Sequence, residues 1–443
     1  MMKLNKYFEL AKEANIEALE IYIVRNYSLG FSLFHGEIDS YTTNDSISLG
    51  ARGIFNGKMG YAYSEKIDKT TPEFIVKNIV ENAKNITNDN KVTIFEGSKK
   101  YKKFNCYNKE LDIIPVEEKL NKLYEIERKL KESDERITEI GGVGYEESRS
   151  ETILANSYGL KLSEKSNYYV FFAEAVAKDG EETKTGYKTF LECDFSKFDL
   201  DKFVNEVKDN TIKQLGGKPC KSKNYRAVLA PRVVSSLMTA MLNSTIAEEV
   251  QKHSSLFEGK LNTQVLSKKI TISEKPLAHN IFFKGFDDEG VATYNKDIFK
   301  NGVLKTFLYN LETALKDGVE TTGNGYRSSS KSPVGTGFSN IFLKPGKISE
   351  EDMIKKVKNG IYIDSITGLH AGLNAQSGNF SLQATGFMIR DGKIAEPVNL
   401  ITVASNLVKV FQDVTMVANN AELLTNATTV PSIAIKSIMV SGN

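Results

Sequence analysis

Short runs of β-branched and aromatic residues, separated by glycine and asparagine turns, recur through most of this 443-residue chain. The strongest turn signal is Asn56-Gly57, which separates the strand-like runs 46–55 and 58–63. Asparagine and glycine both tolerate the positive φ of a type I′ turn, so these two runs are expected to form a hairpin. Helical periodicity is confined to fewer segments. The sequence therefore predicts an α+β fold in which strands predominate.

The pattern divides the chain into three units. We expect an N-terminal αβ domain at 1–95, a middle α+β domain at 108–220 and a large strand-rich C-terminal domain at 222–443. A polar, lysine-rich stretch at 87–110 separates the first two units and is typical of a solvated linker. Gly216, Gly217 and Pro219 break regular structure before the third unit.

The expected elements follow from periodicity and from their flanking residues. Helices are expected at 4–14, 72–86, 115–133, 200–215, 231–246, 348–358 and 406–411. Strands of the first two units are expected at 18–24, 27–35, 46–55, 58–63, 137–146, 150–156, 160–177 and 183–193. The third unit begins with a strand at 226–229 and continues mostly as short β segments.

Composition excludes several functional classes. The 58 basic and 56 acidic residues leave a net charge of +2, which gives no concentrated basic field for direct nucleic-acid binding. The N-terminus lacks an apolar signal-peptide core, and no apolar stretch approaches the roughly 20 residues that span a bilayer. Cys106, Cys193 and Cys220 are widely spaced and odd in number, which favours a reducing compartment. We therefore expect a cytoplasmic protein that contacts no membrane.

The sequence offers no local metal motif. The four histidines, His35, His253, His279 and His370, are far apart, and no HExxH, HExxxH or CxxC pattern occurs. A site assembled from His253, His279 and a carboxylate is an open alternative, but hydrolytic zinc sites usually place their ligands at short spacing on a rigid element. We expect neither a bound metal nor another cofactor.

One serine and one lysine have the spacing of a catalytic pair. Ser328 and Lys331 form an S-x-x-K pattern, in which the lysine could accept the proton of the serine. The pattern lies between a glycine-containing turn and Pro333, without the helix that normally presents it. Ser328 and Lys331 are therefore weak catalytic candidates.

Two further loops have both a functional and a structural interpretation. Asp287, Asp288 and Glu289 precede Gly290 and could bind a cation through oxygen ligands, or form an acidic turn before a strand. The stretch 323–325, Gly-Asn-Gly, could begin a phosphate-binding loop, but no third glycine and no helix follow, so a turn is favoured.

The helix expected at 231–246 has two unlike faces. One is a continuous apolar stripe. The other is formed by small, weakly polar residues, which include Ser235, Ser236, Thr239, Asn243 and Ser244. A freely exposed helix would carry charges there, so this face indicates either burial against another backbone or the floor of a groove.

The third unit resembles the TldD/PmbA family, the modulators of DNA gyrase. The matching stretches occur in the family's order and are LNTQV (261–265), FDDEGV (286–291), KNGVL (300–304), TGNG (322–325), SGNF (377–380), ATGF (384–387), RDGKI (390–394) and VANN (417–420). On this resemblance alone, the motif-loop residues become candidate site residues; they are Asp287, Asp288, Glu289, Asn324 and Arg327.

The resemblance also implies a branch within the family. The TldD branch is a metallopeptidase with HExxxH on the helix that opens the third domain and a late cysteine ligand. Here that helix reads LMTAMLNS at 237–244, and no cysteine follows Asn420. The chain is thus similar to the PmbA branch, also called TldE, which lacks these ligands and pairs with TldD.

The resemblance to the PmbA branch implies a non-catalytic subunit of a peptidase complex. Such a subunit would help to hold extended peptides by strand addition. The expected partners are a metal-bearing TldD-type paralogue, in a heterodimer, or a second copy of the chain. The alternatives are a self-sufficient hydrolase using Ser328 and Lys331, and a binding protein that acts on gyrase.

Overall fold

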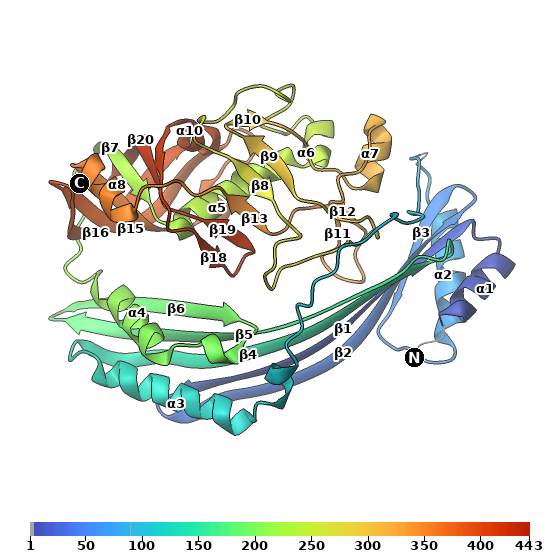
Figure 1. The fold of residues 1–443 in the computed structure, drawn as a ribbon, viewed down its shortest axis with the longest axis horizontal. Coiled ribbons are helices and arrows are strands. Elements are labelled where there is room, and N and C mark those ends of the chain that lie inside the picture. Colours follow the sequence, from blue (N-terminus) through green and yellow to red (C-terminus); the bar gives the residue numbers. More distant parts are fainter. Residues whose placement is uncertain (1–3, 89) are drawn as a thin grey trace.

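The computed structural model describes residues 4–88 and 90–443. A long curved sheet formed by the first half of the chain lies beneath a strand-rich body formed by the second half (Figure 1). The predicted α+β class, with N-terminal αβ units and a strand-rich C-terminal domain, is confirmed.

The helices, in chain order, are α1 (Asn5–Glu13), α2 (Thr71–Lys84), α3 (Val116–Glu132), α4 (Leu200–Ile212), α5 (Pro231–Leu242), α6 (Ala247–Gln251), α7 (Leu311–Asp317), α8 (Glu350–Val357), α9 (Leu369–Gly372) and α10 (Leu407–Gln412). In the described part of the chain, none of them combines the length and the apolar character needed to cross a bilayer.

The strands of the first half are β1 (Ala18–Phe34), β2 (Glu37–Phe55), β3 (Lys58–Ser64), β4 (Ile137–Asn156), β5 (Lys161–Asp179) and β6 (Glu182–Glu192). Those of the second half are β7 (Lys223–Leu229), β8 (Ile272–Glu274), β9 (Lys296–Lys300), β10 (Val303–Leu304), β11 (Gly325–Tyr326), β12 (Gly335–Thr336), β13 (Ile341–Leu343), β14 (Gly360–Thr367), β15 (Asn379–Arg390), β16 (Lys393–Asn406), β17 (Val414–Val417), β18 (Glu422–Leu424), β19 (Thr428–Val430) and β20 (Ile433–Ser441).

The first two sequence units share one antiparallel sheet with the strand order β3-β2-β1-β4-β5-β6. β1 and β4 are each one long strand, whereas the sequence predicted two short strands in each place. Polar residues such as Asn26 and Ser148 interrupt the apolar pattern, but their backbones pair with both neighbouring strands. Ladder hydrogen bonds therefore hold the strand together where side-chain patterning suggested a break.

The predicted hairpin at Asn56-Gly57 is confirmed. Asn56 and Gly57 have φ values of 49° and 70°, and Phe55 pairs with Lys58 across the turn. This turn adds the short strand β3 to one end of β2 and leaves the rest of that strand's outer edge unpaired.

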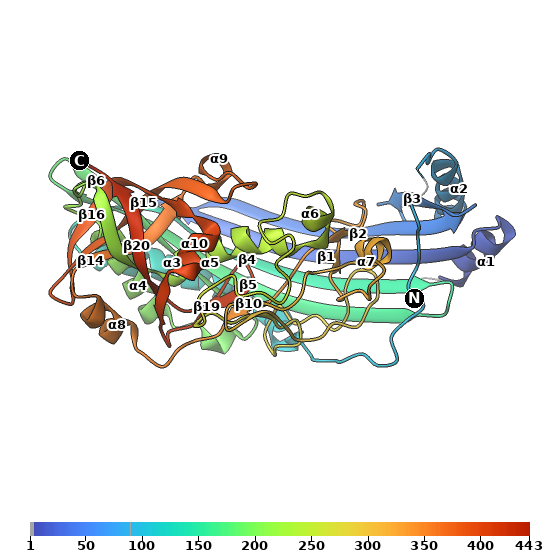
Figure 2. The same ribbon diagram turned by 90° about the horizontal axis from the view of Figure 1, so that it is seen from above.

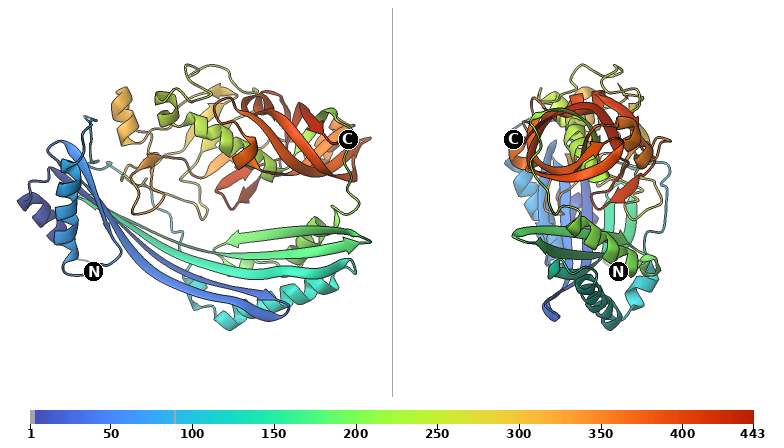
Figure 3. Two further views of the ribbon diagram at one scale, coloured as in Figure 1. Left: turned by 180° about the vertical axis from the view of Figure 1, so that it is seen from behind. Right: turned by 90° about the vertical axis from the view of Figure 1, so that its left-hand side faces the viewer.

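Helices cover one face of the long sheet in two places (Figure 3). α1 and α2 pack at one end, where Ile75 and Ile79 belong to the same apolar cluster as Leu19 and Ile21. α3 and α4 pack at the other end, over a cluster rich in aromatic rings in mutual contact that includes Tyr145. The opposite face of the sheet is turned toward the third domain.

The third domain is built on two sheets around one core. One sheet has the order β10-β9-β8-β13-β19-β18, and the other has the order β16-β15-β14-β7-β20-β17. Pairing of β16 with β20 closes the second sheet on itself. Helix α5 belongs to the apolar cluster that both sheets share, with Leu237, Met238 and Met241 almost fully buried.

Candidate functional site

A large cleft separates the middle domain from the third domain. Its cavity volume is about 850 Å³, which lies within the usual size range of ligand sites. β6 and α4 form one wall, and α5, β14 and the β18–β19 hairpin form the other. Figure 1 shows β6 and α4 below the third domain, at the end of the molecule away from α1 and α2.

Helix α5 presents its first turns to this cleft. Pro231 begins the helix, a position where its missing N–H costs no hydrogen bond. Arg232, Ser235 and Ser236 line the cleft, while the apolar stripe on the other side of the helix enters the core. The small polar face therefore borders a groove near the helix start.

The remaining small polar residues of this face lie elsewhere. The side-chain oxygen of Thr239 is buried without a hydrogen-bond partner among the described residues. The helix ends at Leu242 rather than at residue 246, and Asn243 and Ser244 belong to a 3₁₀ turn. Neither Thr239 nor these two residues line the cleft.

Hydrogen bonds tie α5 to the β18–β19 hairpin on the same wall. The hydroxyls of Ser235 and Thr428 lie 2.7 Å apart, and the side-chain amide of Asn426 donates to the Ser235 hydroxyl at 2.9 Å. Because Ser235 is almost fully buried, these bonds fix the floor of the cleft.

The charged side chains on the cleft walls are of balanced sign. Arg232 donates from Nε to the backbone carbonyl of Asp364 at 2.6 Å, and its Nη2 pairs with the Asp364 carboxylate. Lys213 lies 3.5 Å from the same carboxylate. The cleft therefore presents hydroxyls, amides and paired charges rather than a field of one sign.

The cleft is also bounded by two free strand edges. β6 is the last strand of the long sheet, and β18 is the last strand of a third-domain sheet. Residues 187–191 of β6 and 422–424 of β18 all line the cleft. A free strand edge offers unpaired backbone N–H and C=O groups to an extended chain.

Metal-ligating side chains do not gather here. From Pro231 to Leu242, α5 carries no histidine, cysteine, aspartate or glutamate. Within residues 4–88 and 90–443, no group of three or more such side chains is placed to hold a metal ion. His253 instead pairs with Glu258 at 2.7 Å, and His279 stacks on Phe104.

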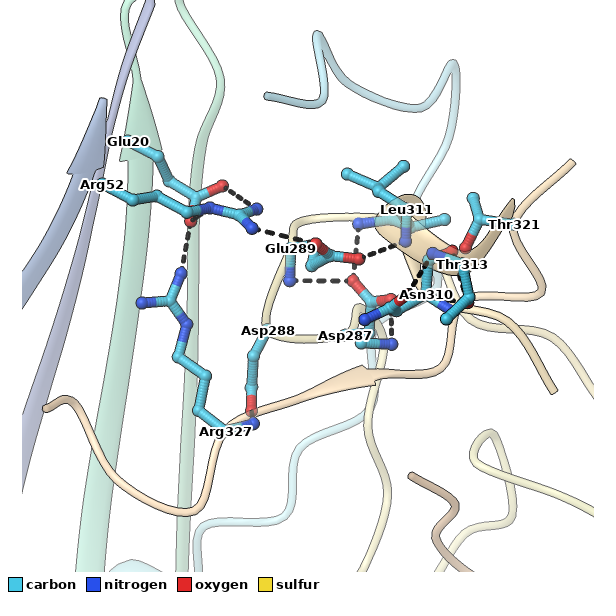
Figure 4. Close-up of polar contacts among 12 residues, drawn as sticks. Glu20, Arg52, Asp287, Asp288, Glu289, Asn310, Leu311, Thr313, Thr321 and Arg327 are labelled. Atoms are coloured by element: carbon cyan, nitrogen blue, oxygen red, sulfur yellow. Dashed lines mark hydrogen bonds and ion pairs between the residues drawn. The ribbon is translucent and has the colours of Figure 1, made fainter. Parts of the chain in front are cut away.

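The acidic motif Asp287-Asp288-Glu289 lies far from the cleft, in the contact between the first and third domains. Figure 4 shows its three carboxylates pointing in different directions. Asp287 accepts hydrogen bonds from the backbone N–H groups of Glu289, Val291 and Gly325 at 2.8–3.0 Å. Burial, and next the neighbouring Glu289 carboxylate, raise the pKa of Asp287 well above its ordinary value.

Glu289 and Asp288 bind residues of the first domain. Glu289 accepts from Arg52 at 3.0 Å and from the backbone N–H of Leu311 at 2.7 Å. Asp288 accepts from the Tyr22 hydroxyl at 3.2 Å and from Lys284 at 2.7 Å. Burial, and next the negative charge of Asp288, raise the pKa of Tyr22 to about 12.

Two arginines complete this buried network by meeting at Glu20. Arg52 donates to both carboxylate oxygens of Glu20, at 2.9 and 3.0 Å, and Arg327 donates to one of them at 2.5 Å. The backbone N–H of Arg327 also bonds to Asp288 at 2.8 Å. The network joins domains and satisfies buried charges, a structural role rather than a catalytic one.

Asn324 takes part in a neighbouring buried cluster. Its side-chain amide donates to Glu274 at 2.9 Å and to the carbonyl of Gly337 at 2.8 Å, and Glu274 in turn pairs with Lys296. The loop that resembled a phosphate site is thus a turn held by its own side chains.

Ser328 and Lys331 point to different partners. Ser328 donates to Ser332 at 2.7 Å, while Lys331 pairs with Glu65 of the first domain at 2.6 Å. The bond to Glu65 raises the pKa of Lys331, which keeps the amine protonated and unable to act as a base. The structure does not bring this pair together as a catalytic unit.

Several residues of the buried ionic network could not be recognised as partners of the acidic motif from the sequence. Glu20, Tyr22 and Arg52 lie on strands more than 200 residues from the acidic motif that they bind. A charged residue within an apolar strand pattern, as at Glu20, is the one local hint of a buried ion pair.

The chain is similar to known proteins along most of its length. Three domain models of one family match the chain: PmbA/TldA metallopeptidase domain 1 at 19–86, the central domain at 109–215 and the C-terminal domain at 222–442. An uncharacterized protein of Methanocaldococcus jannaschii is 29% identical over 93% of this chain and 94% of its own. A protein of Escherichia coli O157:H7 named metalloprotease PmbA is 22% identical over 93% and 89%.

Solved structures of other proteins superpose on this chain over nearly its full length. A Thermotoga maritima protein described as a candidate modulator of a DNA gyrase superposes with a TM-score of 0.90 at 29% identity, covering 99% of both chains. TldE from Thermococcus kodakarensis superposes with a TM-score of 0.91 at 22% identity, covering 99% of this chain and 100% of that one, which shows a common fold.

Proposed function

The chain belongs to the PmbA/TldD family of metallopeptidase-like proteins, and from this premise we propose that it is a subunit without a catalytic metal of its own. In this proposal it holds an extended peptide in the cleft between its middle and third domains. A metal-bearing relative, bound to it in a heterodimer, supplies the hydrolytic chemistry.

The observation that carries the proposal is the chemistry of α5. A zinc peptidase needs ligands that hold the metal, and a carboxylate that moves the proton of the attacking water. The helix offers Arg232 and several hydroxyls at the cleft, and neither type of group meets those needs. The residues present do not fit a catalytic zinc, so no step of a reaction is assigned to this cleft.

What the cleft can do is bind backbone. The turn between Asp179 and Glu182 has two residues, so the odd-numbered residues of β6 direct their N–H and C=O groups away from β5. One such group, the carbonyl of Tyr187, accepts from Asn210 at 3.2 Å. Further along the strand, Thr189 is exposed and lines the cleft. A peptide could pair with β6 there by strand addition, which recognises the peptide backbone rather than particular side chains.

The serine–lysine alternative is not favoured, because Ser328 and Lys331 contact different partners. Alanine at either position is expected to change the activity of the complex by less than a few-fold. A change of that size corresponds to less than about 1.4 kcal/mol in activation free energy.

The test measures cleavage of a fluorogenic, unstructured peptide by the chain alone and by the chain mixed with a family member that carries HExxxH. We expect cleavage by the mixture only, and loss of that cleavage on chelation. Cleavage by the isolated chain in chelator would overturn the proposal, and so would a mixture no more active than the metal-bearing member alone.

Two matched variants connect the activity to the cleft. Thr189→Pro removes an outward N–H at a strand edge, where proline is tolerated. We expect it to lower the activity of the mixture at least tenfold, whereas Thr189→Ala should stay within about twofold. Equal activity of both variants would contradict peptide binding on β6.

A further inference from the structure

The long sheet has a second free edge, far from the cleft. β2 pairs with β1 along its whole length, but β3 covers its outer side only from Leu49 onward. Among the residues that the structure describes, the segment from Glu37 to Ser48 therefore has one row of backbone groups without a strand partner, over about 40 Å at 3.3 Å per residue. Figure 2 shows β2 as the outer strand along this side of the sheet.

Side chains of this segment are open to solvent on both faces. Every residue from Glu37 to Ser46 is exposed. Three large apolar side chains of these two strands are exposed, with exposed fractions of 41% for Phe34, 47% for Ile38 and 54% for Tyr41. Apolar side chains beside an unpaired edge are typical of a surface that another chain covers.

Most of this edge is open to pairing. Natural edge strands are blunted by charged residues, above all lysine, by proline, by a bulge or by a covering element. Residues 37–48 contain no lysine and no proline. A register shift opposite Ser32 and Leu33 disturbs only the hairpin end, and the pairing of residues 40–48 with β1 is regular.

The direction of the free backbone groups follows from the hairpin turn. Phe55 and Lys58 flank a two-residue turn and form a hydrogen-bonded pair, so odd-numbered residues of β2 face the β3 side. The carbonyl of Ile54 accordingly accepts from Glu17 on the β1 side. By the same alternation, Thr43, at the middle of the free segment, directs its N–H and C=O outward.

Charge identifies the kind of partner. Glu37, Asp39 and Asp45 are the charged residues of segment 37–48, so the edge is acidic throughout. Pairing with a second copy would bring six carboxylates onto one ladder. Like charges opposite each other destabilise a sheet, whereas lysine or arginine opposite these acids stabilises it.

We propose that the free edge of β2 is a docking site for an extended, basic strand of another protein, which pairs with residues 37–48 and places lysine or arginine against Glu37, Asp39 and Asp45. This surface is separate from the cleft. It recognises its partner by charge as well as by backbone hydrogen bonds. The proposal stands whether or not a peptide binds on β6.

The test uses a labelled 12-residue peptide of alternating threonine and lysine, and measures binding by fluorescence anisotropy. We expect binding that weakens steeply with added salt, and at least tenfold weaker binding of the matched threonine–glutamate peptide. No binding of the lysine peptide up to about 1 mM, a weak-affinity limit, would overturn the proposal.

Variants locate the contact. Thr43→Pro removes the outward N–H at the centre of the edge and is expected to weaken binding at least tenfold, whereas Thr43→Ala should stay within twofold. Both variants are made in the Thr189→Pro protein, so that strand addition on β6 does not contribute to the measured binding. Unchanged binding after Thr43→Pro would place the peptide elsewhere and overturn the proposal.

A change in the probe avoids any effect of a variant on folding. The same lysine peptide with N-methyl groups on alternate residues keeps its charge but cannot complete the ladder. We expect it to bind the unaltered protein at least tenfold more weakly than the parent peptide. Equal affinities would show that charge alone attracts the peptide, which contradicts strand pairing.

Discussion

The third domain meets the other two domains through contacts of opposite character. Against the first domain it forms a buried ionic contact, in which the side chains of Arg52, Glu20 and Glu289 are at most 4% exposed. Against the middle domain it leaves a cleft of about 850 Å³ with solvent-accessible polar walls. The closed contact fixes the third domain at one end of the long sheet, and the cleft at the other end stays free for a ligand.

The difference has an energetic consequence. A buried charge that loses its partner is strongly destabilising, because the protein interior does not replace the lost water. A side chain on an open wall can change with little effect on folding, because solvent reaches it in both states. Substitutions in the ionic contact should therefore report on stability, and substitutions in the cleft on binding.

The largest expected effect comes from Arg52→Met. This change removes the partner of two buried carboxylates, Glu20 and Glu289, and should lower the free energy of unfolding by about 3–5 kcal/mol. Urea denaturation followed by fluorescence measures it. Arg25→Met, at a partly exposed pair with Glu151, is the control and should cost less than about 1 kcal/mol. Equal losses of unfolding free energy for the Arg52→Met and Arg25→Met variants would contradict a special role for burial in the domain contact.

A smaller effect is expected from Ser236→Trp in the cleft. Ser236 lines the cavity and its hydroxyl donates only to the carbonyl of Arg232 within α5, so a large side chain can extend into the open space. We expect about tenfold weaker binding of an unstructured peptide, which equals about 1.4 kcal/mol. The free energy of unfolding should change by less than about 0.5 kcal/mol.

Peptide affinity by anisotropy and urea denaturation of the same Ser236→Trp sample separate the two effects. Ser235→Trp is the contrasting variant, because Ser235 is buried and bonded to Thr428. Overpacking there should cost about 1–3 kcal/mol of stability. An equal loss of unfolding free energy in the Ser236→Trp and Ser235→Trp variants would show that Ser236 is packed as tightly as the core.

The smallest effect is a pH dependence at Glu164, which accepts from the backbone N–H of Gly285 at 2.7 Å in the domain contact. Burial raises the pKa of Glu164 above its ordinary value of 4.5. The folded state therefore holds this proton more tightly than the unfolded state, and the stabilisation is lost as pH rises through the raised pKa. Glu164→Gln should gain stability relative to the unaltered protein as pH rises from about 4 to 8.

Glu182, the first residue of β6, should behave in the opposite way. The backbone N–H of Gly216, and next Lys184, lower the pKa of Glu182. Its contribution is present above the ordinary pKa of 4.5 and is lost as pH falls through the lowered value. Urea denaturation at a series of pH values compares Glu182→Gln with Glu164→Gln. Parallel pH profiles for the two variants would contradict the assignment of the two environments.

Local patterns predicted local structure well. The apolar stripe of α5 and the turn at Asn56-Gly57 both appear as expected, because helix periodicity and turn conformation depend on neighbouring residues. The split of β1 at Asn26 was wrong, because ladder bonds to β2 and β4 override a polar interruption in the strand. The helix containing Thr239 ended earlier than expected, at Leu242, where a 3₁₀ turn begins.

The candidate site was predictable only in part. The small polar face of α5 indicated burial or a groove, and the structure places Ser235 and Ser236 at the cleft but Thr239 away from it. The opposite wall, which includes Thr189, had no local signal, because a groove between domains depends on how the domains are placed. The S-x-x-K spacing was equally uninformative, since Lys331 pairs with Glu65 of another domain.

The α+β class, the hairpin turn and the lack of metal ligands on the helix that opens the third domain follow from residue types and short spacings. Three-dimensional packing was needed to show that Asp288 and Glu289 join domains, that β6 and β18 face one cleft, and that β2 keeps a free edge among the described residues. These three features share one cause. Buried charges and strand edges are defined by partners that lie far away in the chain, and the choice of partner is made by packing rather than by local sequence.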